Sequence, residues 1–365
     1  MFDRRLLTHF DWALLLVVLV IAALGVLNLV GVTASWSSSA LPYYLKQIAW
    51  LGVGLIIVLI ICSVDYRRLE HMAFPLYGIT LLLLVLVLAV GHTSMGATRW
   101  LNLGFIKLQP SELAKVVIII TMACYFTRHD QPLPFSLREL AIPALLLALP
   151  TALIMKQPDL GTAMIVLAIG GTMALFAGIG TRTLLFLAAT GLAGAGGGWF
   201  LLHDYQKQRI LTFLNPEGDP LGAGYHIIQS KIAVGSGGFF GKGFMKGSQS
   251  QLSFLPERHT DFAFSVFAEE WGFWGCLVLL ALFLLIVLWG LRSGRHAADR
   301  FGTFLAVGVT AMLFWHIVIN LGMVIGLLPV VGVPLPLFSY GGTSMITTMI
   351  GVGMLLNVSM RRFKF

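Results

Sequence analysis

The sequence predicts an all-α polytopic membrane protein of about ten transmembrane helices, with one long extracytoplasmic loop between helices 7 and 8. Hydrophobic residues make up 58% of the chain and charged residues only 11%, and the mean hydropathy is +0.88. Nearly all of the length consists of apolar runs close to the ~20 residues that a helix needs to cross a bilayer. Each run must be helical, because the bilayer core offers the backbone no other hydrogen-bond partner.

The apolar runs define the expected helices in order. They cover about residues 12–34, 45–63, 72–91, 111–127, 141–155, 159–178, 183–203, 262–291, 301–325 and 338–360. The fifth run carries Pro143 and Pro150, and prolines interrupt helices, so its limits are the hardest to place. The first run is too long for a signal peptide and has no small-residue cleavage site, so we expect it to remain as a helix.

The distribution of lysine and arginine sets the orientation, because short cytoplasmic loops carry an excess of both. With the N-terminus inside, the inner flanks hold Arg4, Arg5, Arg67, Arg68, Arg128, Arg138, Arg182, Arg292, Arg295, Arg300, Arg361, Arg362 and Lys364. The short outer loops hold only Lys46, Arg99, Lys107 and Lys156. Both termini are therefore cytoplasmic, the loop of about 204–260 lies outside, and residues 1–365 form a single membrane domain. The net charge of +8 reflects this bias and does not indicate nucleic-acid binding.

The cysteines and the long outer loop limit the kinds of metal, disulfide or phosphate-binding site that the chain can form. Cys62, Cys124 and Cys276 lie inside apolar runs and form neither a disulfide framework nor a metal-binding spacing. In the long loop, residues 205–221 are polar with turn signals, and 222–234 predict a short helix on the membrane surface. Residues 235–247 contain six glycines. This glycine run is either a flexible loop or a phosphate cradle built from backbone N–H groups.

Four ionisable residues, Glu257, Arg258, His259 and Asp261, stand directly before the eighth run. Helix capping by Thr260 or Asp261 explains part of this cluster, but it does not explain why four such residues gather there. An acid, a base and cations at the boundary between water and lipid suit chemistry on a lipid-linked substrate. His259 is also a candidate base or metal ligand, although one histidine beside one glutamate is a weak metal signal.

Other acidic residues lie within the predicted spans, where ionisable groups are costly and suggest function. Glu112 and Lys115 are spaced i, i+3 on the fourth span, so they can pair on one face. The pair is either a structural ion pair or part of a polar cavity open to the outside. On the eighth span, Glu269 lies about 12 Å along the helix from Asp261, too far for two carboxylates to act on one glycosidic bond. Glu269 and Glu270 are therefore expected to stabilise the bundle.

Five segments resemble the signatures of the SEDS proteins, the bacterial membrane proteins of shape, elongation, division and sporulation. They are Met95-Gly-Ala-Thr-Arg-Trp100, Gln109-Pro-Ser-Glu-Leu-Ala-Lys115, Lys156-Gln-Pro-Asp-Leu-Gly-Thr162, Phe254-Leu-Pro-Glu-Arg-His-Thr-Asp-Phe262 and Pro336-Leu-Phe-Ser-Tyr-Gly-Gly-Thr-Ser344. The match spans almost the whole chain. Arg258, together with the short N-terminal tail, is more similar to the elongation subfamily (RodA) than to the division subfamily (FtsW).

This resemblance implies a peptidoglycan glycosyltransferase of the bacterial cytoplasmic membrane, active in cell elongation. Its substrate would be lipid II, an undecaprenyl-pyrophosphate-linked disaccharide-peptide, polymerised on the outer face. Its partners would be a class B penicillin-binding protein and other membrane proteins of the elongation complex. The family's essential aspartate falls on Asp261, and its polar pair falls on Glu112 and Lys115.

The chemistry of such a reaction fits these residues. Asp261 could take the proton of the attacking sugar hydroxyl, and cations must stabilise the pyrophosphate leaving group. The cationic candidates are Arg99, Lys115, Lys156, Arg209, Lys231 and Arg258, or a divalent ion (Mg²⁺ or Mn²⁺) held by a carboxylate. The supporting candidates are Asp159, Glu257, His259, Ser339 and Thr343.

Two other functions remain open from the sequence. A lipid II flippase would place ionisable groups near the midplane of the membrane, often with repeat symmetry, and a non-catalytic scaffold would leave the Asp261 cluster without a chemical purpose. Here the polar clusters lie at the outer boundary and the sequence shows no repeat, which favours an enzyme. The FtsW-type division paralogue is the alternative within the family.

Overall fold

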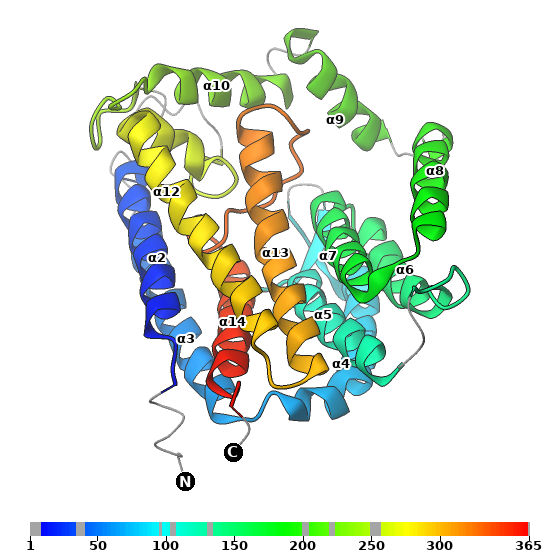
Figure 1. The fold of residues 1–365 in the computed structure, drawn as a ribbon. Coiled ribbons are helices and arrows are strands. Elements are labelled where there is room, and N and C mark those ends of the chain that lie inside the picture. Colours follow the sequence, from blue (N-terminus) through cyan, green and yellow to red (C-terminus); the bar gives the residue numbers. More distant parts are fainter. Residues whose placement is uncertain are drawn as a thin grey trace.

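Long apolar helices lie side by side and form a bundle, with shorter helices across one end (Figure 1). The computed structural model describes residues 9–33, 41–94, 97–102, 107–129, 134–198, 204–218, 223–248 and 257–363. The helices at the predicted spans are α2 (Trp12–Thr33), α3 (Tyr43–Ser63), α4 (Arg67–Val90), α5 (Pro110–Arg128), α6 (Ala141–Lys156), α7 (Leu160–Gly178), α8 (Thr181–Gly198), α12 (Ala263–Arg295), α13 (Arg300–Val324) and α14 (Gly342–Met360). Helix α14 packs along α3, α12 along α13, and α4 along α5.

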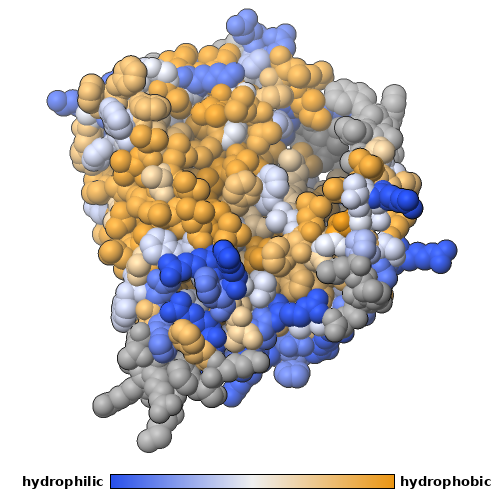
Figure 2. All heavy atoms as spheres, viewed as in Figure 1, coloured by the Kyte–Doolittle hydropathy of each residue, from blue (hydrophilic) through white to orange (hydrophobic). Residues whose placement is uncertain are grey.

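The prediction of a polytopic helical membrane protein is confirmed. Within the described residues, eight helices are long and apolar enough to cross a membrane. The other two predicted spans correspond to α6, which is shorter at 16 residues, and to α8. On the face shown in Figure 2, a broad apolar band crosses the bundle, with polar groups gathered beyond it at both ends. The chain is therefore a multi-pass membrane protein, and the apolar band is the surface that lipid covers.

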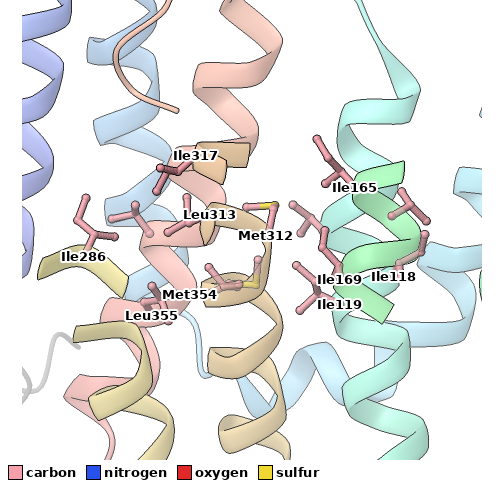
Figure 3. Close-up of a cluster of buried hydrophobic side chains, with 14 of the residues drawn as sticks. Ile118, Ile119, Ile165, Ile169, Ile286, Met312, Leu313, Ile317, Met354 and Leu355 are labelled. Carbon is pink, nitrogen blue, oxygen red and sulfur yellow. The ribbon is translucent and has the colours of Figure 1, made fainter. Parts of the chain in front are cut away.

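The core lies between α5, α7, α12, α13 and α14, whose side chains meet in the middle of the bundle (Figure 3). Close packing in this region holds the helices at fixed positions relative to one another, so that their ends form a rigid frame. The buried residues shown are Ile118, Ile119, Ile165, Ile169, Ile286, Met312, Leu313, Ile317, Met354 and Leu355.

The segment of 92–110, between the third and fourth apolar runs, contains a small antiparallel sheet. Its strands are β1 (His92–Ser94), β2 (Ala97–Asn102) and β3 (Lys107–Leu108), in the order β1-β2-β3. Leu101 pairs with Leu108, which brings the end of β2 close to the start of α5 at Pro110. The sheet therefore fixes the position of Arg99 relative to the first turn of α5.

The long outer loop contains more helix than expected. The predicted surface helix is present as α10 (Ala223–Ser236), which lies across the end of the bundle (Figure 1). The polar segment of 205–221 begins with a helix that was not expected, α9 (Asp204–Leu214), and one of its turn signals forms a 3-10 turn, η2 (Pro216–Gly218). Short helices satisfy backbone groups internally, which suits a segment that lies at the membrane surface.

The glycine run is a structural insert, and neither a free loop nor a phosphate cradle. Helix α12 is broken at Gly272, where φ is 66° and ψ is −163°. The amides of Lys242 and Gly243 donate to the carbonyls of Glu269 and Glu270, both at 3.0 Å, while Phe273 N donates to Gly238 O at 2.8 Å. These bonds satisfy the groups that the break exposes, as non-helical backbone at membrane depth requires. A Cβ at Gly272 would collide with the Gly241 amide, because the two backbones are in direct contact.

Glycines of α12 and α13 make close contacts within this chain, and these contacts limit where a partner helix could dock. Gly272, Gly275, Gly302 and Gly308 are the small residues by which the sequence suggests a docking face on the eighth and ninth spans. A Cβ at Gly302 would meet the Tyr66 ring, and one at Gly308 would meet Ile119 and Met173. Gly272, Gly302 and Gly308 thus serve packing within this chain and do not form a lipid-facing stripe for another helix.

Candidate active site

A cavity of about 860 Å³ lies among the ends of α3, α5, α7, α12 and α14. Its polar and charged lining residues are Lys46, Arg99, Gln109, Glu112, Asp159, Thr162, His259, Thr260, Asp261, His316, Thr343 and Ser344. Its aromatic lining residues are Tyr43, Trp50, Trp100 and Tyr340. The cavity thus brings residues from all five sequence signatures to one place.

Each of these helices begins at the cavity, and this sets the electrostatic character of the site. Helices α3, α5, α7 and α14 begin at Tyr43, Pro110, Leu160 and Gly342, and α12 begins two residues after Asp261. A helix N-terminus carries the equivalent of about half a positive charge and exposes unpaired N–H groups. Several N-termini around one cavity therefore favour an anionic ligand.

Hydrogen bonds to the backbone hold Asp261 in place directly before the start of α12. Asn320 Nδ2 donates to Asp261 O at 2.9 Å and to Val333 O at 2.7 Å, so one amide joins the Asp261 segment to the loop between α13 and α14. A second link is the bond from Tyr340 N to His259 O at 2.9 Å. Gly332 has φ of 72°, and a Cβ there would lie 3.4 Å from Asp261 Oδ2. The carboxylate therefore lies close to the Gly332 segment of this loop.

The environment of Asp261 changes its acidity. The pKa of Asp261 is raised from its usual value to about 7, first by burial and then by the negative charge of Glu257. Arg209 and Arg99 oppose this shift. Burial also lowers the pKa of His259. A carboxylate with a pKa near 7 matches the requirement for a general base at neutral pH.

A second carboxylate, Asp159, organises the opposite wall. It is 2% exposed and accepts hydrogen bonds from Thr162 Oγ1 at 2.9 Å, Gln109 Nε2 at 3.0 Å and Ser111 Oγ at 3.3 Å. Arg99 Nη1 lies 3.7 Å from its other oxygen. This network joins the start of α5 to the start of α7 and holds the Arg99 guanidinium at the cavity wall.

The predicted Glu112–Lys115 pair is present beneath the same wall. Lys115 Nζ lies 2.6 Å from Glu112 Oε1 and 2.8 Å from Nε2 of His316 on α13. His316 Nδ1 lies 2.7 Å from Met312 O, and a carbonyl can only accept. Nδ1 therefore carries the proton, and Nε2 accepts from Lys115. Glu112 lines the cavity while Lys115 is buried behind it, so the pair forms part of a polar cavity.

The remaining sequence candidates do not line this cavity. Lys156 is exposed at the end of α6, and Lys231 packs against Gly326. Ser339 is buried and accepts from Leu335 N at 3.1 Å, which is a turn contact. Arg258 is buried outside the lining. Glu257 and Arg209 act on Asp261 through their charges.

The structure also adds residues that the sequence did not single out. Lys46, Gln109 and His316 belong to the cavity, as do the rings of Tyr43 and Tyr340. His316 carried a usable signal, since an ionisable residue inside an apolar span indicates function by default. Lys46 had been counted only as an outer-loop charge. The i, i+3, i+7 spacing of Tyr43, Lys46 and Trp50 places them on one face of α3.

The binding of a divalent cation, which the sequence analysis considered, remains a prediction. In the described segments, no group of three or more His, Cys, Asp or Glu side chains is arranged to hold a metal. Glu112, Asp159 and Asp261 are the carboxylates of the cavity lining. Mg²⁺ is often bound by one or two carboxylates together with substrate phosphates, so these side chains would hold an ion only jointly with a phosphate ligand.

Comparison with known proteins identifies the relatives of this chain. The family model for cell cycle proteins of the FtsW/RodA/SpoVE type matches residues 9–364. The chain is 44% identical to the peptidoglycan glycosyltransferase MrdB of Escherichia coli K12, over 97% of this chain and 94% of that protein. It is 34% identical to the peptidoglycan glycosyltransferase RodA of Treponema pallidum, over 98% and 99% of the two chains.

Solved structures agree with this relationship. One structure of a peptidoglycan synthase complex, described as coordinating polymerisation and crosslinking, matches with a TM-score of 0.83 at 35% identity and covers 98% of this chain and 99% of its own. The crystal structure of the rod-shape-determining protein RodA of Thermus thermophilus matches with a TM-score of 0.72 at 33% identity, over 98% of both chains. The chain therefore belongs to the FtsW/RodA/SpoVE family of cell cycle proteins.

Proposed function

We propose that this protein is a peptidoglycan glycosyltransferase that polymerises lipid II on the outer face of the bacterial cytoplasmic membrane during elongation. The observation that carries the proposal is the placement of Asp261 in a polar cavity at which five helices begin. Relatives named MrdB and RodA are peptidoglycan glycosyltransferases. Identity to MrdB, at 44%, is higher than identity to an FtsW relative of Geobacter metallireducens, at 38%, and this supports the elongation role over the division role.

In the proposed reaction the hydroxyl oxygen of one lipid-linked sugar attacks the anomeric carbon of another. Asp261 accepts the hydroxyl proton as the new carbon–oxygen bond forms. The bond between the anomeric carbon and the phosphate oxygen breaks, and its electron pair leaves with the lipid diphosphate. Arg99 and the surrounding helix N-termini stabilise the negative charge that develops there. Glu112 and Lys115 keep the wall beneath polar and fixed.

The direct test is polymerisation of purified lipid II by the purified protein together with its partner, a class B penicillin-binding protein. The partner should carry an inactivated crosslinking site, so that glycan strands remain linear and can be sized on a gel. We expect strands of many disaccharides. Absence of any product longer than lipid II, from protein that is folded and bound to its partner, would contradict the proposal.

The pKa of Asp261 gives a pH dependence. A base works only when deprotonated, so a pKa of about 7 predicts that the polymerisation rate rises with pH and levels off above about 7. Below that pH, each unit should reduce the rate about tenfold. Glu257→Gln removes a charge that raises this pKa, so its profile should shift to lower pH. A profile that is flat between pH 5.5 and 7.5 would exclude this titration.

The partner is also expected to activate the enzyme. The short inner loops leave little soluble surface, so regulation must act through the lipid-facing helices or through the loop of 204–260. Polymerisation should be faster with the class B penicillin-binding protein, and hydrogen exchange in α9 and α10 should slow. The Lys242 and Gly243 amides, already bonded to α12, should remain protected in both cases and serve as an internal reference. Equal rates and unchanged exchange would mean that the partner only co-localises two enzymes.

A further inference from the structure

The cations of the cavity are not equivalent. Among the described lining residues, Lys46 and Arg99 are the cationic side chains. Arg99 is already engaged, since it donates to the carbonyls of Gln157 and Pro158 and lies 3.7 Å from an oxygen of Asp159. The Lys46 ammonium has no carboxylate of the described residues within 4.0 Å. Lys46 therefore brings the cavity a positive charge that no carboxylate of the described residues contacts directly.

Aromatic rings tie Lys46 to the segment that carries Asp261. Its ammonium lies 5.1 Å from the centroid of the Tyr43 ring, which is the range of a cation–π contact. The Tyr43 ring lies 4.7 Å from that of His259 and 4.8 Å from that of Tyr340. His259 precedes Asp261 by two residues, so the ammonium and the carboxylate belong to one connected wall of the cavity.

The position of Lys46 on α3 also favours the binding of an anion nearby. Lys46 lies in the first turn of this helix, which contains no acidic residue. A cation there is disfavoured by the partial positive charge of the helix N-terminus. An anion placed between the Lys46 ammonium and the helix N-terminus is attracted by both, so its binding offsets their mutual repulsion. Gly341, Gly342 and Thr343, at the start of α14, line the same cavity and add a second N-terminus.

We propose that Lys46 binds the diphosphate of the lipid-linked sugar and stabilises the charge that the leaving lipid diphosphate gains. The assignment rests on the proposed function and names a residue for its leaving group. As the acceptor oxygen bonds to the anomeric carbon and its proton passes to Asp261, the electron pair of the broken bond stays on the phosphate oxygen. A compact, mobile ammonium suits a phosphate group whose position changes during this step.

Binding of undecaprenyl diphosphate to the full-length protein in lipid nanodiscs tests the assignment without requiring polymerisation. The neutral alcohol undecaprenol is the comparison ligand, so that binding of the lipid tail cancels. Lys46→Gln should weaken binding of the diphosphate about tenfold or more, since a hydrogen bond between charged groups is lost. Binding of the alcohol should not change. Lys46→Arg keeps the charge and should retain most of the affinity.

Lys246→Gln is the matched control, because it removes an exposed lysine outside the cavity. It should bind both ligands as the unmodified protein does. If Lys46→Gln binds undecaprenyl diphosphate as tightly as the unmodified protein, the assignment is overturned. Equal weakening by Lys46→Gln and Lys246→Gln would also overturn it, because the effect would then be a general surface charge effect.

The two proposals fail in distinguishable ways. If the unmodified protein does not polymerise lipid II but its preference for the diphosphate depends on Lys46, the binding assignment stands and the enzymatic proposal falls. If it polymerises lipid II but the diphosphate preference is independent of Lys46, the reverse holds. A thermal unfolding curve of Lys46→Gln that matches the unmodified protein shows that any loss of binding is local.

Discussion

Asp261→Asn is expected to reduce glycan polymerisation by about 10²–10⁴-fold, the usual loss when a general base is removed. The amide has nearly the same shape as the carboxylate but cannot take the hydroxyl proton. The backbone anchors from Asn320 and Tyr340 do not involve the side chain, so the variant should fold and bind its partner. The measurement is the rate of glycan strand formation from purified lipid II.

Glu217→Gln supplies the control for this experiment. Glu217 is an exposed carboxylate of η2, in the same outer loop but outside the cavity lining. Its substitution should leave the rate unchanged. Near-normal polymer from Asp261→Asn would rule out proton abstraction by Asp261 and would leave it only a positioning role.

The second large effect is expected from the buried pair of Glu112 and Lys115. Neutralising either residue leaves the other charge unpaired in a low-dielectric site, which costs about 3–5 kcal/mol when the pair is fully buried. Glu112→Gln and Lys115→Gln should therefore each reduce stability and activity strongly. The double variant that combines Glu112→Gln with Lys115→Gln should lose less than the two single variants combined. Thermal unfolding and polymerisation rate, measured for all four proteins, give the coupling energy.

The exposed ion pair of Arg128 and Glu70 is the comparison for the buried pair of Glu112 and Lys115. Its nitrogen and oxygen lie 3.2 Å apart, but its side chains are 44% and 26% exposed. Water screens such a pair, so neutralising either residue should cost only about 0–1 kcal/mol. If the double variant at Glu112 and Lys115 merely adds the two single defects, the pair does not interact and the observed contact carries no energy.

The positions of the membrane helices followed from the sequence because a bilayer imposes both their length and their backbone bonding. The sheet of 92–108 and helix α9 did not, since neither has a run long enough to show a clear period. The insert at Gly272 was also out of reach. Its hydrogen bonds join Lys242 and Gly243 to residues of α12 that are more than 20 positions away in sequence. In addition, a loop segment with six glycines resembles a flexible segment.

The candidate site shows the same division. Asp261, Glu112 and Lys115 were identifiable because charged groups near or inside lipid are costly. Their common cavity with Arg99 and Asp159 was not predictable, because it depends on how α3, α5, α7 and α14 are arranged around one another. That arrangement explains why Lys231 and Ser339, which were candidates from the sequence, lie outside the cavity lining. It also explains why Lys46 lies inside it.

This protein is proposed to make glycosidic bonds and not to carry lipid II across the membrane. The most direct measurement uses liposomes with lipid II in one leaflet, the purified protein and its crosslinking-inactive partner. Linear glycan and free undecaprenyl diphosphate should appear together, one diphosphate for each bond formed, and Asp261→Ala should abolish both. Lipid II that moves between leaflets unchanged, equally well with the unmodified protein and with Asp261→Ala, would contradict the account.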